Sequence, residues 1–219
     1  MTREMWDRLA AAGGLMSVVL FVIGWLIYGN GPTVADDPGA ILRFFADNHD
    51  RVIWSMFVQG LGTLAMIWFM SALVMAMLDA REPLLAVAAG MSFVVALALG
   101  SAATIMRSGL AFISIGDISP DTVAVIFHLG SVIDTGQNII SAGFFLPVAV
   151  AALRTRFIPA WWGRVSLVAG LWAVASTTAL NHGGFWSPHG AGFLNLVFYI
   201  VWVGGTSILL INRMRISAA

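Results

Sequence analysis

Long apolar segments separated by short polar ones dominate the chain. They cover residues 10–29, 52–78, 84–106, 122–153, 161–180 and 191–211, and each is bounded by charged residues or by Gly and Pro. A helix that crosses a bilayer needs about 20 apolar residues, so each segment is long enough to span a membrane. The pattern predicts an all-α fold, a polytopic membrane protein with six transmembrane helices in one bundle. We expect residues 1–219 to form this single domain.

The composition agrees with a membrane location and excludes several kinds of functional site. Hydrophobic residues make up 59% of the 219 residues and charged residues only 10%, against roughly 25% charged in soluble domains. Cysteine and lysine are both absent, which excludes disulfides and thiolate metal sites as well as a Schiff base with retinal or pyridoxal phosphate. The zero net charge gives no sign of a nucleic-acid partner. The expected partners are membrane lipid and a larger membrane complex or a homo-oligomer.

The arginines predict how the chain is oriented, because short cytoplasmic loops collect positive charge. If both termini are cytoplasmic, only Arg43, Arg51 and Arg107 lie on the outer side. The cytoplasmic side then holds Arg3, Arg8, Arg81, Arg154, Arg156, Arg164, Arg213 and Arg215. The bias toward Arg, Ala and Gly is typical of a GC-rich bacterial genome, so we expect a bacterial inner-membrane protein.

The longest loop, residues 30–51, contains its own helix signal. Asp36-Asp37-Pro38 combines an N-cap residue with proline at the first helical position. The sequence predicts a short interfacial helix whose apolar face lies on the outer leaflet while Arg43 and Asp47 face water. The apolar residues concerned are Ile41, Leu42, Phe44 and Phe45. The alternative is an ordinary structured connector.

Polar residues follow one face of the fourth segment. Asp134 lies twenty residues before Arg154, which corresponds to about 30 Å of helix and so to the outer boundary of the hydrocarbon. Unpaired polar groups cost several kcal/mol in lipid, so this face should line an extracytoplasmic-side cup within the bundle. Asp134 is either a functional carboxylate or half of a structural ion pair with Arg107. The candidate ligand-binding residues are Asp134, Arg107, Gln59, Gln137, Asn138, Asn195 and His128.

Three interpretations of the cup remain open. The first is a binding or transport site for a small or lipidic ligand. The second is a membrane-embedded metalloenzyme or transporter holding a divalent metal on outer histidines and carboxylates, since these are adequate ligands without any thiolate. The histidines in question are His49, His128, His182 and His189. The third is an accessory subunit of a membrane complex, favoured by the small size and the absence of recognised catalytic motifs.

Three stretches also carry a family resemblance. They are Phe44-Phe45-Ala46-Asp47-Asn48, the stretch from His128 to Pro147 that continues to Ile158-Pro159-Ala160-Trp161-Trp162-Gly163, and Gly184-Phe185-Trp186-Ser187-Pro188. The chain resembles a family of six-helix bacterial integral membrane proteins of unknown function. The resemblance implies the six-helix topology and implies no activity.

Overall fold

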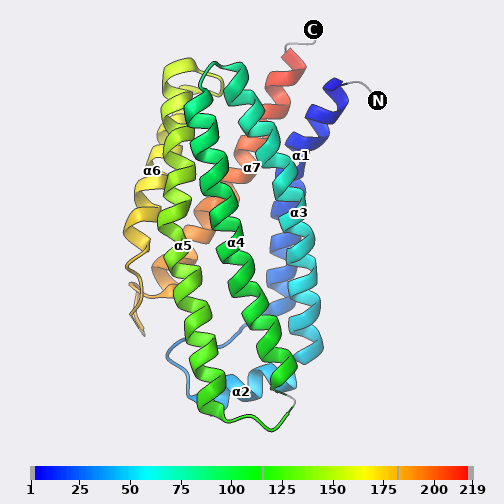
Figure 1. Cartoon of the computed structure of the whole chain (residues 1–219), viewed down its shortest axis with the longest axis vertical. Coiled ribbons are helices and arrows are strands. Elements are labelled where there is room, and N and C mark those ends of the chain that lie inside the picture. Colours follow the sequence, from blue (N-terminus) through cyan, green and yellow to red (C-terminus); the bar gives the residue numbers. More distant parts are fainter. Residues whose placement is uncertain (1–2, 115, 182, 217–219) are drawn as a thin grey trace.

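The computed structural model describes residues 3–114, 116–181 and 183–216, and this part of the chain contains helices without a strand (Figure 1). The elements are α1 (Arg3–Tyr28), α2 (Pro38–Asp47), α3 (His49–Asp79), α4 (Pro83–Ile113), α5 (Pro120–Thr155), α6 (Ala160–Ser176), the π-helical turn η1 (Pro188–Gly192) and α7 (Phe193–Ile216). The predicted all-α class is therefore confirmed.

Among the described residues, five helical stretches are long and apolar enough to cross a membrane: Met5–Tyr28, His49–Asp79, Pro83–Ile113, Pro120–Thr155 and Pro188–Arg213. The fifth predicted segment forms α6, which ends at Ser176 after 17 residues, about 26 Å, instead of reaching residue 180. The hydroxyls of Thr177 and Thr178 donate to the carbonyls of Ala173 and Ala175 just where the helix stops. Side-chain bonds of this kind compete with helix continuation.

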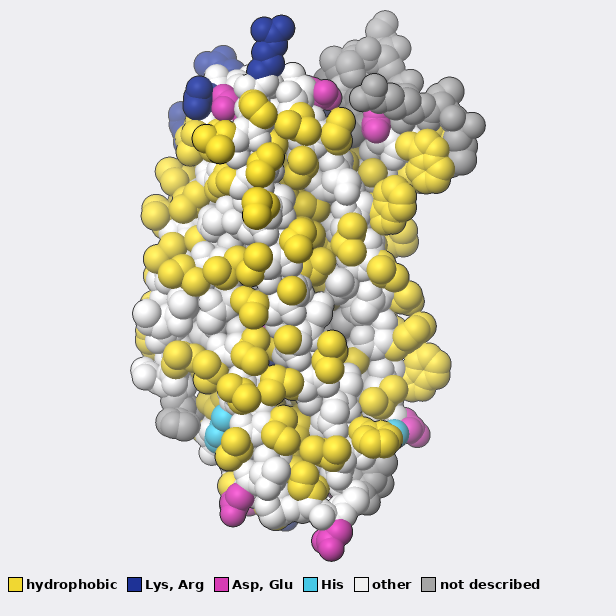
Figure 2. Space-filling view, in the orientation of Figure 1, with side chains coloured by type: hydrophobic (Ala, Val, Ile, Leu, Met, Phe, Trp, Pro, Cys, Tyr) yellow, Lys and Arg dark blue, Asp and Glu magenta, His cyan; other side chains and the backbone are white. Residues whose placement is uncertain are grey.

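Six helices close into a ring. Each of α1, α3, α4, α5, α6 and α7 packs against the next, and α7 packs against α1. Neighbouring helices run in opposite directions, so α1 begins and α7 ends at the same end of the bundle, opposite α2 (Figure 1). Figure 2 shows arginine side chains gathered at that end and a broad apolar surface between the two ends.

The helices of the ring reach unequal distances toward the α2 end. α3 and α4 have 31 residues each and α5 has 36, about 46 to 54 Å against a hydrocarbon thickness of about 30 Å. α6 and the start of α7 stop well before the ends of these three helices (Figure 1). One half of the ring therefore extends farther than the other half at the α2 end.

The third predicted segment is longer than expected because its charged residue does not end it. The prediction placed the end at residue 106, before Arg107, whereas α4 continues to Ile113. Arg107 lies inside the bundle with a carboxylate partner, so it interrupts neither the helix nor its packing. Leu110 and Ala111 beyond it are completely buried.

Buried apolar residues form two separate cores along the bundle. The arginine-side core is built around Phe69, Phe144, Phe145, Trp162 and Trp202. The α2-side core consists of Ile41, Phe45, Val52, Met56, Leu110, Ala111, Val123, Ala124 and Phe127. The space between the two cores is where the polar residues gather.

The predicted short helix is present as α2, but its apolar face was assigned to the wrong environment. Asp37 caps the helix by accepting a hydrogen bond from the Gly39 amide (2.9 Å). Ile41 and Phe45 are completely buried against the projecting ends of α3, α4 and α5, and Leu42 and Phe44 pack onto the same core. The sequence pattern of an apolar stripe is the same whether the stripe contacts lipid or protein. Here the ends of α3, α4 and α5 cover it. α2 therefore closes that end of the bundle over α3, α4 and α5.

Candidate functional site

A layer of polar side chains separates the two cores. On α4, Arg107 lies between Phe93 of the arginine-side core and Leu110 of the α2-side core. On α5, the polar stretch lies between Phe127 and Ala142 in the same way. We define the polar layer as Tyr28, Arg107, Asp134, Gln137, Asn138, Ser176, His189 and Asn195.

The first group in the polar layer is an ion pair between α4 and α5. Arg107 Nη2 lies 2.6 Å from Asp134 Oδ2, and Gln137 Nε2 donates to Asp134 Oδ1 at 3.0 Å. Gly100 makes room for Gln137, because a Cβ at that position would lie 2.9 Å from Gln137 Oε1. The predicted pairing of Asp134 with Arg107 is thus present, and Gln137 completes the coordination of the carboxylate.

The ion pair faces the inside of the ring. Tyr28 of α1 and His189 of η1, which lie on other sides of the ring, are both within electrostatic reach of Arg107. Nevertheless 25% of the Arg107 side chain and 38% of the Asp134 side chain remain accessible. The pair is therefore not fully covered by its protein neighbours.

Arg107 is only partly satisfied by its partner. A guanidinium carries five N–H groups, and the hydrogen bond to Asp134 uses one of them. The other four have no hydrogen-bond acceptor within the described ranges. Because the Arg107 side chain is partly accessible, these four donors are available to a group that approaches the pair.

The second group in the polar layer joins α5, α6 and α7. Asn138 Nδ2 donates to Ser176 Oγ (3.1 Å), and Asn195 Nδ2 donates to Asn138 Oδ1 (2.8 Å). All three side chains are buried. Asp134 and Asn138 are four residues apart on α5, so their side chains lie on the same face about 5–6 Å apart. The ion pair and the amide chain are therefore neighbouring parts of one site.

The turn η1 brings His189 to the polar layer. Ser187 caps this turn by accepting a hydrogen bond from the Gly190 amide (3.2 Å). The His189 imidazole lies near the backbone of Pro32 and within electrostatic reach of Arg107, Asp134 and Asp36. His189 thus connects the loop after α1 to the ion pair.

Two predicted site residues have other surroundings. Gln59 Nε2 donates to Ser55 Oγ (3.0 Å), which itself donates to the Gly24 carbonyl, so Gln59 lies in the α1–α3 interface. The His128 ring lies tilted beside that of its neighbour Phe127 in the α2-side part of the bundle (ring centroids 6.1 Å apart). Neither residue contributes a hydrogen bond to the Arg107–Asp134 pair.

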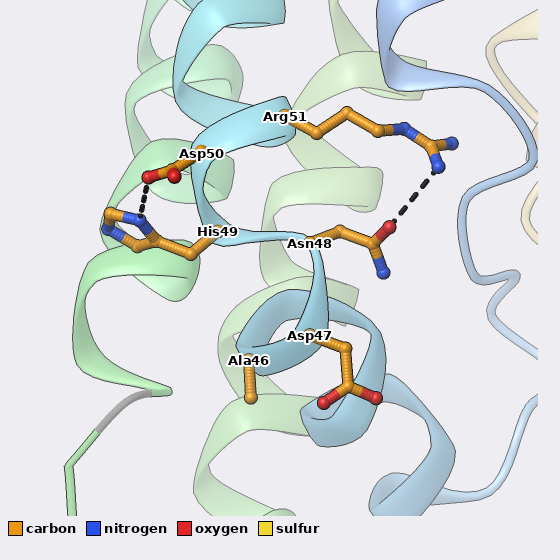
Figure 3. Close-up of a pocket in the computed structure, with 6 residues that line it drawn as sticks. All are labelled: Ala46, Asp47, Asn48, His49, Asp50 and Arg51. Carbon is orange, nitrogen blue, oxygen red and sulfur yellow. Dashed lines mark hydrogen bonds and ion pairs between the residues drawn. The ribbon is translucent and has the colours of Figure 1, made fainter.

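The predicted histidine cluster is not assembled by the part of the chain that the structure describes. His49 pairs with its neighbour Asp50 (2.9 Å) in a shallow pocket at the junction of α2 and α3 (Figure 3). His182 lies outside the described residues. Among residues 3–114, 116–181 and 183–216, no group of three His, Asp or Glu residues could hold a metal ion. The sequence indicated that the histidines lie on the same side of the membrane. Residues on one side of a membrane need not lie close enough to bind one metal ion.

Arg51 in this pocket has a structural role at the end of α1. Its guanidinium donates to the carbonyls of Ile27 (2.7 Å) and Tyr28 and to Asn48 Oδ1 (3.2 Å) (Figure 3). Gly29 follows with a φ of +63°, and a Cβ there would overlap the Arg51 guanidinium. Arg51 therefore satisfies the last carbonyls of α1 and ties α1 to the start of α3.

Tyr28 and Ser176 belong to the polar layer, and sequence reasoning missed both. Tyr28 lies at the end of the first apolar segment, where a tyrosine is usually interpreted as an anchor at the membrane interface. Ser176 is a small residue in an apolar helix and carries no signal of its own. The fifth segment was expected to reach residue 180, so its outer end was assigned to residues beyond Ser176, where α6 ends.

No protein-family model, curated protein or solved structure matches this chain. The interpretation of the polar layer therefore rests on its geometry.

Proposed function

We propose that this protein crosses a bacterial inner membrane six times, with both termini cytoplasmic, and binds a small or lipidic ligand in the polar layer. The family of six-helix membrane proteins that the sequence resembles stays a prediction within this proposal. The observation that carries the binding function is the accessible Arg107–Asp134 pair inside the ring of helices.

The six-span topology is supported by the arrangement of the ends. An even number of crossings returns the chain to the side on which it started, and α1 begins at the same end of the bundle as α7 ends. That end also carries Arg81, Arg154, Arg156 and Arg164, as expected for a cytoplasmic face. α6 is nearly long enough for a 30 Å slab by itself.

Ligand binding is supported by the unused donors of Arg107. A charge in the membrane region is costly unless it is paired or meets water or a ligand, and such residues usually mark function. Asp134 balances the charge of Arg107 but leaves four N–H groups for another acceptor. Phosphate or carboxylate oxygens are the acceptors that a guanidinium recognises best.

Native mass spectrometry of the detergent-purified protein tests the proposal. We expect a bound small molecule or lipid that is retained by the wild type and by the control Arg43→Gln, and that is lost from Arg107→Gln. Arg43 is an exposed arginine on α2, so its substitution removes the same charge elsewhere. Equal retention by both variants, or no bound molecule in the wild type, would contradict the proposal. A stoichiometric protein partner in place of a small molecule would favour the accessory-subunit interpretation.

A further inference from the structure

The side-chain amide of Asn195 has an acceptor atom that the described part of the chain leaves unused. Asn195 is only 7% exposed, and its Oδ1 atom is buried without a hydrogen-bond partner among the described residues. A buried polar group that lacks a partner costs free energy, so native structures normally supply one. The described residues supply no donor, so this acceptor is available to a bound group.

The hydrogen-bond chain fixes the orientation of this amide. The Ser176 hydroxyl donates its single proton to the Ala173 carbonyl, so it can only accept from Asn138 Nδ2. Asn138 then presents Oδ1 to Asn195, which must present Nδ2 in return. Asn195 Oδ1 is consequently an acceptor that needs an O–H or N–H donor.

A second unpaired group lies at the same junction. The indole Nε1 of Trp172 on α6 is buried and has no acceptor in the described part of the chain. Trp172 lies one helical turn before Ser176, and its ring packs against Phe198, three residues after Asn195 (centroids 6.2 Å apart). The α5–α6–α7 junction therefore offers one unused acceptor and one unused donor, which is the complement of hydroxyl groups.

The depth of the polar layer matches that of lipid headgroups. Asp134 lies twenty residues, about 30 Å, along α5 from Arg154 at the arginine end. The hydrocarbon is about as thick, so the polar layer lies where the headgroups of the opposite leaflet begin. α6 ends at Ser176, which bonds Asn138 one turn from Asp134. α3, α4 and α5 continue past the end of α6 and carry α2 (Figure 1). A headgroup can thus reach the layer beside α6 and α7 without leaving its leaflet.

We propose that the polar layer binds the headgroup of an anionic, hydroxyl-bearing phospholipid, with the phosphate on Arg107 and a hydroxyl on Asn195. This inference rests on the proposed function and specifies its ligand. Arg107 bonds Asp134 and Asn195 bonds Asn138. These two α5 residues are one turn and about 5–6 Å apart, a spacing similar to that between the phosphate and the terminal hydroxyl of a glycerol headgroup. Trp172 donates to an oxygen of the same headgroup.

Two lipids that differ only in the hydroxyls test this assignment. Phosphatidylglycerol and phosphatidylmethanol of identical acyl composition carry the same phosphate charge, but only the first has a hydroxylated headgroup. Native mass spectrometry of the full chain, titrated with each lipid, gives the ratio of their affinities. We expect wild type to prefer phosphatidylglycerol roughly tenfold, as one or two additional hydrogen bonds would give. Free glycerol 3-phosphate, tested in parallel, shows whether the headgroup binds without its acyl chains.

Variants test whether the preference for phosphatidylglycerol depends on the side chains proposed to bind its headgroup. Trp172→Phe removes the N–H and keeps an aromatic ring, and Asn195→Leu removes the acceptor at similar volume. Both should bring the ratio close to one while phosphatidylmethanol still binds, and Arg107→Gln should weaken both lipids. If Asn195→Leu fails to fold, Trp172→Phe alone still decides the outcome.

The possible results distinguish a failure of the lipid assignment from a failure of ligand binding at Arg107. Equal binding of the two lipids by the wild type would overturn the hydroxyl assignment and leave ligand binding at Arg107 standing, as expected if Asn195 holds only a water molecule. Tighter binding of glycerol 3-phosphate than of either lipid would overturn the lipid as the source of the headgroup. Absence of binding by all three compounds would contradict this inference, and retention of another molecule that depends on Arg107 would still support the proposed function.

Discussion

Arg107 on α4 and Asp134 on α5 meet at 2.6 Å between the two apolar cores, and both side chains remain partly accessible inside the ring of helices. This pair is the link between the packing of the bundle and its proposed function. It holds two helices together, and it leaves a guanidinium that can bind a further group.

Neutralising Asp134 should destabilise the protein, because Arg107 then keeps its charge without a partner. Breaking a fully buried pair costs about 3–5 kcal/mol. The partial exposure of this one lowers the expectation to about 1–3 kcal/mol for Asp134→Asn. Thermal unfolding in detergent measures the effect against Asp47→Asn, which alters an exposed carboxylate on α2. Equal stabilities of these two variants would show that the pair contributes nothing.

The contact between α1 and α3 should tolerate no added methyl group at Gly13. A Cβ there would lie 2.6 Å from the Ala65 carbonyl oxygen, so Gly13→Ala must push two helices apart. We expect a loss of about 1–3 kcal/mol, the usual range for overpacking. Gly60→Ala is the matched control on α3, since its Cβ meets open space and alanine favours a helix by about 1 kcal/mol. A milder effect at Gly13 than at Gly60 would contradict the close approach.

α2 should behave as part of the folded core and not as a helix resting on lipid. Phe45 is completely buried against Phe127 and its neighbours, so Phe45→Ala should cost about 3–5 kcal/mol. Arg43→Ala on the exposed face serves as the control. Hydrogen exchange should show α2 amides that are protected in wild type and lose protection in Phe45→Ala. If α2 amides exchange freely in wild type, the burial described here is wrong.

Single cysteines can test the orientation directly, because the chain has no native cysteine. A cysteine at position 117, in the loop between α4 and α5, should react with a membrane-impermeant thiol reagent in spheroplasts. A cysteine at position 81, between α3 and α4, should react only after the cells are opened. Both positions are exposed, so access across the membrane decides the result. The reverse pattern would overturn the proposed topology.

The sequence was sufficient to predict the elements whose signals are local or depend on depth. Apolar runs of bilayer length located five of the long helices, and Asp37-Pro38 located the start of α2. Arg107 and Asp134 could be paired because counting residues at 1.5 Å each places two points on different helices at the same level. That count is independent of how the helices pack.

Residue counting could not predict which side chains of different helices face one another around the ring. The depth of Gln59 is compatible with the polar layer, yet its side chain faces α1 because Gly24 leaves room for it there. The same limit explains the error at α2, since the hydrophobic pattern of Ile41 and Phe45 does not say what covers them. Asn195 and Ser176 are joined only through Asn138, an arrangement of three helices that no spacing along the chain encodes.

A high-resolution density map of the protein in phosphatidylglycerol nanodiscs would show whether the polar layer holds a ligand. We expect non-protein density in the polar layer, in contact with the guanidinium of Arg107 and extending toward the side-chain amide of Asn195. A layer filled by protein side chains alone, or an Arg107–Asp134 pair that faces the outside of the ring, would contradict it.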